Sequence, residues 1–386
     1  MPIAPGAASA APLRVMVVIS ALGYGGAETQ VVELANSVDP GDVELHICSL
    51  STHVPQANRL RFPGRLHIVR KRWRFDLTVV QRLARLLRSL RIDVVHGYLF
   101  DAEIAAALAG RLAGVRGVVG SERNASYEIS KLQRFTYRMT RGCFDRIVAN
   151  SQAGATFNRR TLGFPTSYYR VVRNGVDTTR FRPVDATATR AALGLAPSTP
   201  VIGMFASLKP QKNHLLLLQA ARAVLAALPE AHFLFVGDIL LGGKLGSTDY
   251  AHKVHAAVDS LGLRSACQFL GNRTDLPELY SACDLTVLPS LFEGTPNAVL
   301  ESLACGCPVV VTDVADNALI VPDRHVGRVV PSGDHAALSR AIVEILTVPG
   351  YRATLAANVR DWAEREFSLH ALSTNMAKVY RELASG

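Results

Sequence analysis

The sequence predicts an α/β fold built from two doubly wound parallel sheets, each with helices on both faces. Short apolar runs alternate with helical patterns over the first ~180 residues, and the alternation starts again near residue 200. A crossover rich in Pro, Thr and Ala, residues 181–200, separates the two series. The chain has 386 residues, more than one hydrophobic core usually contains. We therefore expect two Rossmann-like domains that face each other across a cleft.

The ends of the two series give the expected domain boundaries. The first domain is predicted over residues 1–182 and the second over residues 183–368. A C-terminal helix, residues 369–386, is expected to cross back to the first domain. The N-terminal stretch lacks a charged segment followed by an apolar one, so we interpret it as an irregular tail and not as a signal peptide.

The individual elements follow from apolar runs bounded by turn residues. Strands of the first sheet are expected at 14–20, 44–50, 65–70, 91 to about 96, 115–123, 144–151 and 168–177. Strands of the second sheet are expected at 200–207, 232–238, 266–271, 284–289 and 326–330, with one more after the helix that follows residue 295. Helices are expected at 127–143, 213–227, 250–261 and 276–283, and after the strand at 326–330 to the end.

Charge is distributed unevenly along the chain. Residues 1–182 carry a net charge of +13, whereas the remainder carries −3. The basic density peaks at 59–74 and continues as Arg82, Arg85, Arg88 and Arg91 on a predicted helix with an apolar stripe. This helix either packs on the sheet with its arginines in solvent or attracts anionic lipid head groups or an acidic acceptor. Nucleic acid is not expected as a partner, because no recognised binding module accompanies the charge.

Six cysteines show neither a CxxC pair nor a zinc-ligand spacing. Cys305 and Cys307 are interpreted as small core-facing residues. No window holds the 18 or more uninterrupted apolar residues of a membrane-spanning helix. The cytoplasm is therefore the expected compartment.

The most informative segment is residues 284–311, which predicts a strand, a loop, a helix and a second strand. Thr295 is a good helix N-cap, and Pro296 suits the first helical turn. The free amides at the start of this helix would face the loop after the strand and form a natural anion site. Glu293 lies at the mouth of that loop and Glu301 lies along the helix, where carboxylates can bind sugar hydroxyls. The alternative is an ordinary βαβ unit with two incidental glutamates.

Two further segments have the chemistry of phosphate binding. Residues 23–28, GYGGAE, follow the first strand, and adjacent glycines let backbone amides approach an anion. Because residue 28 is Glu, the pattern is not G-x-G-x-x-G and a nicotinamide site is disfavoured. In the second domain, Lys209 and Lys212 stand at the start of a helix, where a cation can meet phosphates.

Polar residues also end several strands, at the sheet edge where ligands of such folds bind. Candidates of this kind are His96, Ser121, Glu122 and Arg123 in the first domain, and Gly237, Asp238, Asn272 and Arg273 in the second. A histidine in such a position is more often structural than catalytic.

Taken together, these motifs resemble the family 4 retaining glycosyltransferases, which have the GT-B fold. The resemblance runs from about residue 13 to 385. It is carried by the E-x7-E pair Glu293 and Glu301, the GGAE turn at 25–28, PQK at 210–212 and NGVD at 174–177. The chain departs from the family pattern at Ser207, which replaces the arginine of a G-R-L triplet. It also keeps only His96 of an H-x-H-x-x-H pattern, with Tyr98 and Asp101 at the other two positions.

The resemblance implies a donor held mainly by the second domain and an acceptor held by the first. Donor-binding residues are then Gly25, Gly26, Lys209, Lys212, Gly237, Asp238, Asn272, Glu293, Gly294, Thr295, Asn297 and Glu301. Acceptor-binding residues are Tyr24, Glu28, Tyr98, Glu122 and Arg123, and catalytic candidates are His96, Asp101, Lys212 and Glu293.

The expected function is that of a retaining hexosyltransferase. It would move a sugar from a nucleotide-sugar, with UDP-sugar preferred over GDP- or ADP-sugar, to a glycan or lipid-linked acceptor in cell-surface polysaccharide or glycolipid biosynthesis. The nucleotide-sugar is a substrate, so no cofactor is expected, and no metal either, since no Asp-x-Asp cluster follows a strand. An anionic membrane surface is a further expected partner, with the protein peripheral on its inner face. Two alternatives stay open at this point: a nucleotide-sugar 2-epimerase, and a nucleotide-sugar-binding protein with a decayed active site.

Overall fold

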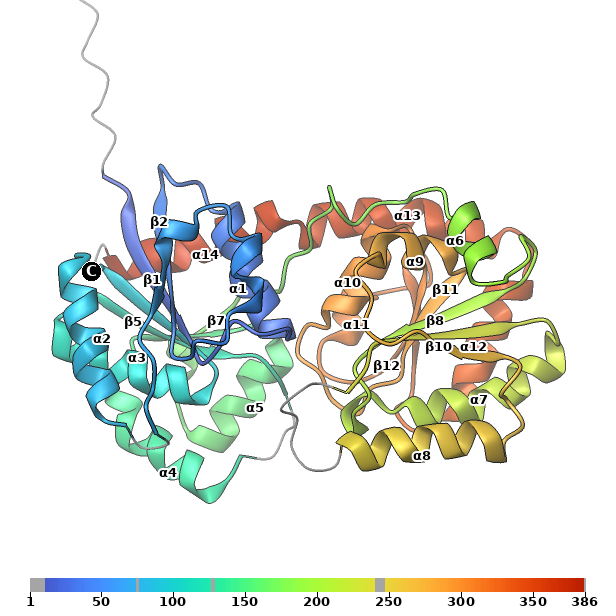
Figure 1. Ribbon diagram of the computed structural model, residues 1–386, viewed down its shortest axis with the longest axis horizontal. Coiled ribbons are helices and arrows are strands. Elements are labelled where there is room, and N and C mark those ends of the chain that lie inside the picture. The colour runs from blue at the N-terminus through green and yellow to red at the C-terminus, as the bar shows by residue number, and fades with distance from the viewer. Residues whose placement is uncertain (1–10, 74–75, 126–128, 240–246, 385–386) are drawn as a thin grey trace, which may run out of the picture.

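The computed structural model contains two parallel sheets, each covered by helices, that lie side by side (Figure 1). It describes residues 11–73, 76–125, 129–239 and 247–384. The predicted α/β fold with two doubly wound sheets is confirmed. Most of the expected N-terminal tail, and the first residues of the helix expected from 127, lie outside the described residues.

The first sheet has seven strands in the order β3-β2-β1-β4-β5-β6-β7, paired in parallel. These strands are β1 (Leu13–Ile19), β2 (Val43–Ser49), β3 (Leu66–Ile68), β4 (Val94–Tyr98), β5 (Gly117–Glu122), β6 (Arg146–Ala149) and β7 (Tyr169–Val171). One face packs against α1 (Gly26–Ser37) and α14 (Leu369–Ala384). The other packs against α2 (Thr78–Ser89), α3 (Phe100–Ala113), α4 (Lys131–Thr140) and α5 (Gln152–Leu162). This sheet and its helices are called the first unit below.

The second sheet has six parallel strands in the order β10-β9-β8-β11-β12-β13. They are β8 (Val201–Phe205), β9 (His232–Val236), β10 (Cys267–Phe269), β11 (Leu285–Leu288), β12 (Val309–Thr312) and β13 (Gly327–Val330). One face is covered by α7 (His214–Ala227), α8 (Ser247–Ser260) and α12 (His335–Thr347). The other is covered by α9 (Leu276–Ala282), α10 (Asn297–Ala304) and α13 (Tyr351–Phe367), while α6 (Thr187–Ala192) and α11 (Asn317–Ile320) are short connecting helices. This is the second unit.

The chain crosses between the units twice, and the two crossings lie side by side. Val176 on the outward crossing bonds through its amide to the Phe367 carbonyl at 2.7 Å, and it forms a parallel bridge with Ser368 on the return. After the return, α14 packs on the first sheet, where Met376 and Tyr380 are wholly buried beside β1 and β4 (Figure 1). The last helix of the chain therefore completes the hydrophobic core of the first unit.

Helix α2 packs on the sheet as one of its two interpretations predicted. Val79, Leu83 and Leu87 are buried among residues of the first sheet, while Arg85 and Arg88 are exposed. The apolar stripe of α2 therefore packs in the core of the protein and is not available to a lipid surface.

Two of the cysteines have the core positions that the sequence predicts. Cys305 and Cys307 are both 3% exposed within the core of the second unit, as predicted.

Within residues 11–73, 76–125, 129–239 and 247–384, no helix combines the length and apolar character needed to cross a membrane. The same described part of the chain holds no cluster of His, Cys, Asp and Glu that could bind a metal ion.

Candidate active site

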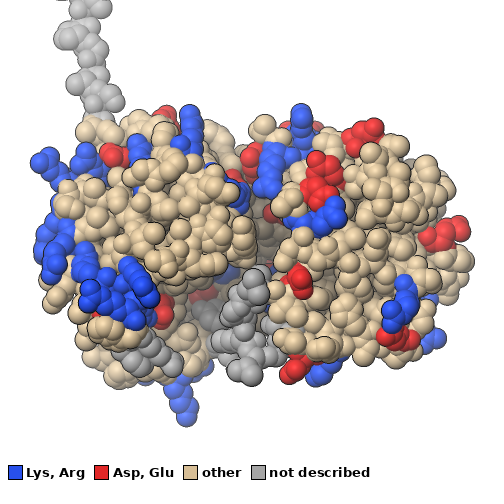
Figure 2. Space-filling model, viewed as in Figure 1, with Lys and Arg blue, Asp and Glu red and all other residues tan. Residues whose placement is uncertain are grey.

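A cavity of about 610 Å³ lies between the two units, at the edges where the strands of both sheets end. Figure 2 shows the surface hollowed between the two lobes. Fifteen of the predicted site residues line this cavity: Tyr24, Gly25, Gly26, Glu28, Arg123, Lys209, Lys212, Gly237, Asn272, Arg273, Glu293, Gly294, Thr295, Asn297 and Glu301. Six others, His96, Tyr98, Asp101, Ser121, Glu122 and Asp238, are not among its lining residues.

The E-x7-E segment forms the wall of the cavity in the second unit. After β11 the chain makes a loop, and α10 begins at Asn297 with Pro296 as its N-cap residue. The prediction that Thr295 caps this helix is wrong, because its hydroxyl donates to the Asn150 carbonyl across the cleft instead. The amides at the start of α10 consequently have no side-chain cap and face the cavity, as an anion site requires.

Gly294 cannot be replaced by a larger residue in this loop. A Cβ at this position would lie 2.6 Å from the Arg123 carbonyl oxygen and would also strike the Asn150 side chain. The neighbouring Glu293 carbonyl accepts from the Ala125 amide at 2.8 Å. The loop that bears Glu293 is therefore seated directly against the first unit.

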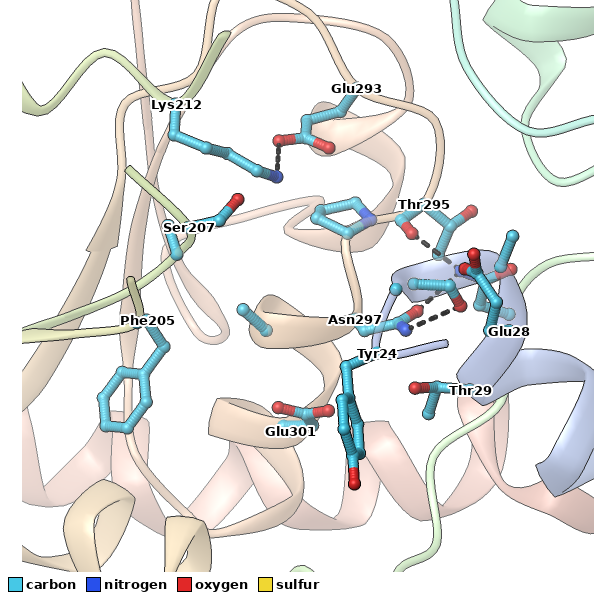
Figure 3. A pocket seen from close by; sticks show the side chains of 18 of the residues that line it. Tyr24, Glu28, Thr29, Phe205, Ser207, Lys212, Glu293, Thr295, Asn297 and Glu301 are labelled. Atoms are coloured by element: carbon cyan, nitrogen blue, oxygen red, sulfur yellow. Dashed lines mark hydrogen bonds and ion pairs between the residues drawn. The ribbon is translucent and has the colours of Figure 1, made fainter. Parts of the chain in front are cut away.

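Lys212 and Glu293 form an ion pair inside the cavity (Figure 3). Lys212 Nζ lies 2.5 Å from Glu293 Oε1, and the same oxygen accepts from the Ser290 hydroxyl at 2.6 Å. The two charged side chains are 16% and 6% exposed, so the pair is largely removed from water. Burial, together with the positive charge of Lys212, lowers the pKa of the neighbouring Lys209. A ligand phosphate that entered here would meet two adjacent cations.

Lys212 and Lys209 are positioned by an irregular turn and not by the first turn of α7. Residues 210–212 form a short 3-10 helix, and α7 begins at His214 after Asn213, whose φ of 54° is left-handed. Ser207, at the family's usual arginine position, lines the cavity and offers a hydroxyl but no charge. The cations on this wall are the two lysines and Arg273, whose guanidinium is paired with Asp275.

Glu301 lies at the opposite end of the same wall and is held by an aromatic pair. Its Oε2 accepts from the Tyr280 hydroxyl at 2.9 Å, and the Tyr280 ring stacks on Phe205 with centroids 3.7 Å apart. Burial raises the pKa of Glu301, because its charged form is separated from water. Oε1 remains available to accept hydrogen bonds from the hydroxyls of a ligand.

The glycine-rich turn forms the facing wall in the first unit. Gly25 is the N-cap residue of α1 with extended backbone, and a Cβ there would collide with the Glu28 carboxylate. Glu28 lies in the first turn of the helix, and burial raises its pKa. Tyr24 is 72% exposed and lines the cavity beside the turn. This wall therefore presents backbone amides, one carboxyl group and one exposed aromatic ring.

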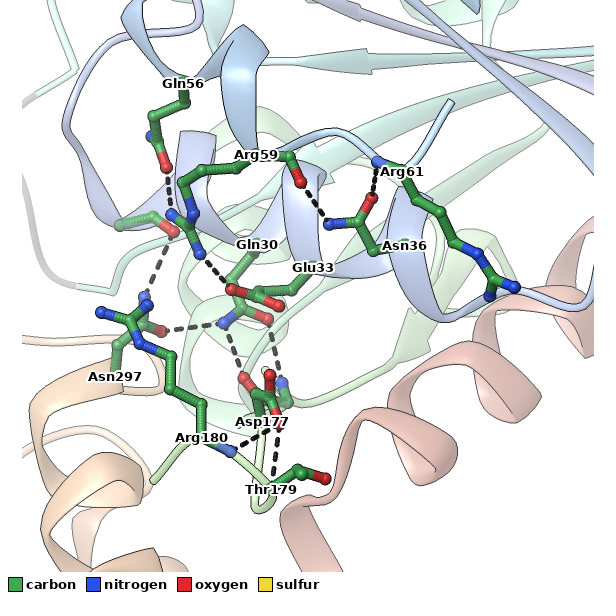
Figure 4. Close-up of polar contacts among 12 residues, drawn as sticks. Gln30, Glu33, Asn36, Gln56, Arg59, Arg61, Asp177, Thr179, Arg180 and Asn297 are labelled. Atoms are coloured by element: carbon green, nitrogen blue, oxygen red, sulfur yellow. Dashed lines mark hydrogen bonds and ion pairs between the residues drawn. The ribbon is translucent and has the colours of Figure 1, made fainter. Parts of the chain in front are cut away.

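Asn297 joins the two walls through a polar network (Figure 4). Its Oδ1 accepts from Asn174 Nδ2 at 2.7 Å and from Gln30 Nε2 at 3.3 Å, and its own amide donates to the Gly26 carbonyl at 3.3 Å. Gln30 in turn exchanges two hydrogen bonds with the Gly175 backbone. The NGVD turn, residues 174–177, thus supports the polar network that joins the two walls.

His96 is not among the residues that line the cavity, so its catalytic role stays a prediction, and its surroundings are those of a structural histidine. It is wholly buried, with Nδ1 2.9 Å from the Tyr380 hydroxyl and Nε2 2.8 Å from the Ser121 hydroxyl. Burial lowers the pKa of His96 to about 3, so the ring is neutral at physiological pH. Tyr98, on the same face of β4, is 1% exposed and packs against the His96 ring at 4.5 Å. Both side chains point into the core that α14 closes.

Three other predicted residues also lie away from the cavity. Asp101 is a surface residue whose carboxylate pairs with Lys71 Nζ at 3.0 Å. Glu122 is buried and accepts hydrogen bonds from the Asn124 amide and from Asn158. Asp238 bonds to the amide of the next residue at 2.7 Å. Each of these carboxylates has a local partner that the sequence pattern did not indicate.

Several lining residues were not predicted. They are Ala27, Thr29, Gln56, Arg59, Leu99, Asn124, Asn150, Asn174, Phe205, Ala206, Gln211, Val236, Leu276, Tyr280, Pro296 and Ala298. Asn150 follows β6 directly, so the rule that polar residues at strand ends meet at one edge would have identified it. Arg59 lies in a 3-10 segment, Pro55–Arg59, and nothing in the sequence pattern marks its position beside the glycine-rich turn.

Comparison with known proteins agrees with this geometry. The family model described as Glycosyltransferase Family 4 matches residues 24–180, and Glycosyl transferases group 1 matches residues 185–362. The UDP-Gal:alpha-D-GlcNAc-diphosphoundecaprenol alpha-1,3-galactosyltransferase of Escherichia coli is 28% identical over 70% of this chain and 70% of its own length. A D-inositol 3-phosphate glycosyltransferase of Salinispora arenicola is 35% identical over 62% of this chain and 55% of its own length, so the match spans little more than half of that relative.

Solved structures support the same fold. Anabaena HepE in complex with UDP superposes with a TM-score of 0.85 at 21% identity, covering 96% of this chain and 100% of HepE. WaaG, a glycosyltransferase involved in lipopolysaccharide biosynthesis, superposes with a TM-score of 0.70 at 16% identity, covering 95% of this chain and 99% of WaaG. The chain therefore belongs to the family 4 glycosyltransferases and has their two-domain GT-B fold.

Proposed function

We propose that this glycosyltransferase moves a hexose from a UDP-sugar to a lipid-linked glycan in the assembly of a cell-surface polysaccharide or glycolipid. The observation that carries the proposal is the cleft itself, where Lys212, Glu293, Glu301 and the uncapped start of α10 face the glycine-rich turn. The E. coli relative is named for a UDP-sugar donor and a diphosphoundecaprenol acceptor, and HepE structures contain UDP and UDP-glucose. These names support the choice of donor and acceptor.

The leaving diphosphate is the group whose charge this cleft is built to stabilise. Lys212 and Lys209 supply positive charge, and the amides at the start of α10 supply directed donors. Lys212 is paired with Glu293 in this structure, so donor binding exchanges that partner for a phosphate oxygen. The released Glu293 carboxylate is then free to contact the transferred sugar, while Glu301 accepts hydrogen bonds from the ribose.

We propose that the anomeric configuration is retained by attack on the same face from which the diphosphate departs. The bond between the sugar C1 and the phosphate oxygen breaks while the acceptor oxygen bonds to C1, and the acceptor proton passes to the leaving phosphate. A double displacement would need a carboxylate nucleophile at C1 with an acid nearby. Glu293, the carboxylate beside the lysines, keeps its hydrogen bond from the Ser290 hydroxyl when Lys212 turns to the phosphate, and we assign it to contact with the transferred sugar and not to attack at C1.

The proposed place of action is the inner face of the membrane, where a lipid-linked acceptor would be available. The net charge of +13 on residues 1–182 favours an anionic surface as a partner of the first unit. Catalysis is expected to continue in the presence of a chelator, since two lysines and helix amides provide the countercharge for the phosphates. Measuring transfer with excess EDTA tests that expectation.

A thermal-shift screen against UDP-, GDP- and ADP-sugars is the direct test of the donor. A ligand at a hundred times its Kd stabilises the folded protein by ~2.7 kcal/mol, which is visible as a rise in Tm. We expect the rise with UDP-sugars and its loss in Glu301→Ala. A rise confined to GDP- or ADP-sugars would contradict the proposed donor. Formation of a 2-epimer without any acceptor would instead support the epimerase alternative, which the E. coli and Salinispora arenicola relatives, both glycosyltransferases, do not favour.

A further inference from the structure

Helix α4 exposes two parallel stripes of side chains on the outer surface of the first unit. Leu132, Phe135 and Met139 form an apolar stripe and are 54%, 61% and 69% exposed. Lys131, Arg134 and Arg138, each one position earlier in the chain, form an exposed basic stripe beside it. Both stripes have the i, i+3, i+7 spacing that keeps side chains on one face of a helix. These six residues are called the α4 face below.

The α4 face is not explained by packing within the protein. The helix buries only Tyr137 and Thr140, which lie on its opposite side. Large exposed apolar residues are common singly, but three on one helical stripe form a contiguous patch that a monomeric soluble protein seldom exposes without a partner. Among the residues that the structure describes, none of the three cations has a carboxylate partner within 4.0 Å.

The helix that presents this face is held firmly to the first unit. Ser130 and Gln133 form a reciprocal capping box at its start. On the inner side, the Tyr137 hydroxyl donates to Glu103 Oε2 at 2.7 Å, and the Tyr137 ring packs edge-on against Phe100. A rigid helix with an exposed amphipathic face loses little conformational freedom when it docks.

We propose that the α4 face docks the enzyme on an anionic lipid bilayer, with Phe135 and its apolar neighbours in the head-group region and the basic stripe on the lipid phosphates. The chemistry of the face specifies this partner, because α4 contains no acidic residue and combines apolar with cationic side chains in adjacent stripes. Figure 2 shows Lys and Arg side chains on the outer edge of the first-unit lobe, and residues 1–182 carry a net charge of +13, so the first unit as a whole adds favourable charge. The inference rests on the proposed lipid-linked acceptor, whose lipid part must stay in the bilayer.

The position of α4 suits this role. Arg123 and Asn124 line the cavity at the end of β5, and α4 begins at Lys131, seven residues after Asn124. The segment between them also contacts the second unit, where the Ala125 amide bonds to the Glu293 carbonyl. Docking through α4 therefore holds the first-unit wall of the cleft close to the membrane. The diphosphate of a lipid-linked acceptor, at the level of the head groups, could then reach this wall.

Vesicle flotation with the full-length protein tests the proposal. The vesicles are phosphatidylcholine with or without phosphatidylglycerol, at low salt and at ~1 M salt, where the Debye length falls to about 3 Å. We expect the wild-type protein to float only with the anionic vesicles at low salt. Arg134→Gln with Arg138→Gln should weaken binding roughly 25-fold, at about 5-fold for each cation. Leu132→Ser with Phe135→Ser and Met139→Ser should weaken it at least as much.

Matched controls carry the same chemical changes in the second unit. Arg222→Gln with Arg340→Gln removes two exposed arginines, and Leu319→Ser with Val348→Ser removes two exposed apolar side chains. Both controls should float like the wild type. Because all substituted side chains on α4 are exposed, each variant should keep the wild-type Tm.

Three results would overturn the proposal. The first is a wild-type protein that does not float with anionic vesicles, and the second is an α4 triple-serine variant that floats as well as the wild type. The third is a wild-type dimer in sedimentation that the triple-serine variant dissociates, which would make the α4 face an interface between copies. UDP thermal shifts on the same variants report on the donor site separately, so a failure of docking is distinguishable from a failure of the proposed function.

Discussion

The two walls of the cleft differ in how they obtain their functional groups. In the second unit, short segments after β8 and β11 carry Lys212 and Glu293 into the cavity, and helix α10 carries Glu301. In the first unit, the polar residues His96, Tyr98 and Glu122 at the ends of β4 and β5 turn into the core, and the cavity is lined by the glycine-rich turn and Arg123. One wall therefore takes its charged groups from two strand ends and the helix that follows, whereas the other combines the glycine-rich turn with side chains from separate segments, among them Arg59 and Arg123.

The difference arises from what covers each strand end. Side chains alternate between the two faces of a strand, so His96 and Tyr98 lie on the same face of β4. That face is covered by α14, and His96 meets the hydroxyl of Tyr380, 284 residues later in the chain. A polar residue at a strand end is thus available to a ligand only when no distant helix buries it.

The largest expected effect comes from Lys212→Ala, which removes a cation from the second-unit wall of the cavity. Loss of one preorganised phosphate contact should lower kcat by on the order of 100-fold or more. Steady-state transfer kinetics measure it, with Lys253→Ala, an exposed lysine on α8, as the matched control. A kcat within a few-fold of wild type would mean that the second-unit wall does not provide the charge for the leaving group.

Glu301→Ala should weaken donor binding, with a smaller effect on kcat. Hydrogen bonds to a charged group are worth about 1.5–3 kcal/mol, so the Kd for UDP should rise about 10- to 150-fold in titration calorimetry. Tyr280→Phe removes only the hydroxyl that holds Glu301 and should cost less. Equal affinities for UDP in the wild type and Glu301→Ala would show that the ribose is bound elsewhere.

His96→Gln distinguishes a structural histidine from a catalytic one. The substitution leaves the neutral buried site without one of its hydrogen bonds. The free energy of unfolding should therefore fall by about 1–3 kcal/mol, which is seen as a lower Tm. Turnover of the folded variant should stay within a few-fold of wild type, because the side chain does not reach the cavity. A hundredfold loss of kcat at an unchanged Tm would instead return His96 to the active site.

The smallest effect is expected at Glu103, which anchors α4 from beneath. Burial raises the pKa of Glu103 from 4.5 to about 8, so the folded state holds this proton over a range where the unfolded state has released it. Folding stability contributed by this proton is therefore present below pH 4.5 and falls as pH rises toward 8, by up to about 1.4 kcal/mol per pH unit. Glu103→Gln should flatten the Tm profile between pH 6 and 8. If the Tm of Glu103→Gln depends on pH as steeply as the Tm of the wild type, another titrating group causes the dependence.

Much of the fold could be predicted from the sequence, because apolar runs and turn residues are local signals. The strands around 284–311, the glycine-rich turn and the lysines at 209 and 212 all have sequence patterns that match their observed places. The N-cap of α10 could not be predicted, since Thr295 turns away to a carbonyl supplied by Asn150 of the other unit. The contribution of Arg59 and the burial of His96 likewise depend on contacts between distant segments, which local patterns do not contain.

The two side-by-side crossings between the units have a mechanical consequence. A single connecting segment would let the units twist and swing about one point, whereas two segments joined at Val176, Phe367 and Ser368 act as a two-stranded hinge. Such a hinge resists twisting and leaves bending about one axis as the easy motion. Opening and closing of the cleft would then return Lys212 and the glycine-rich turn to the same mutual alignment in every catalytic cycle.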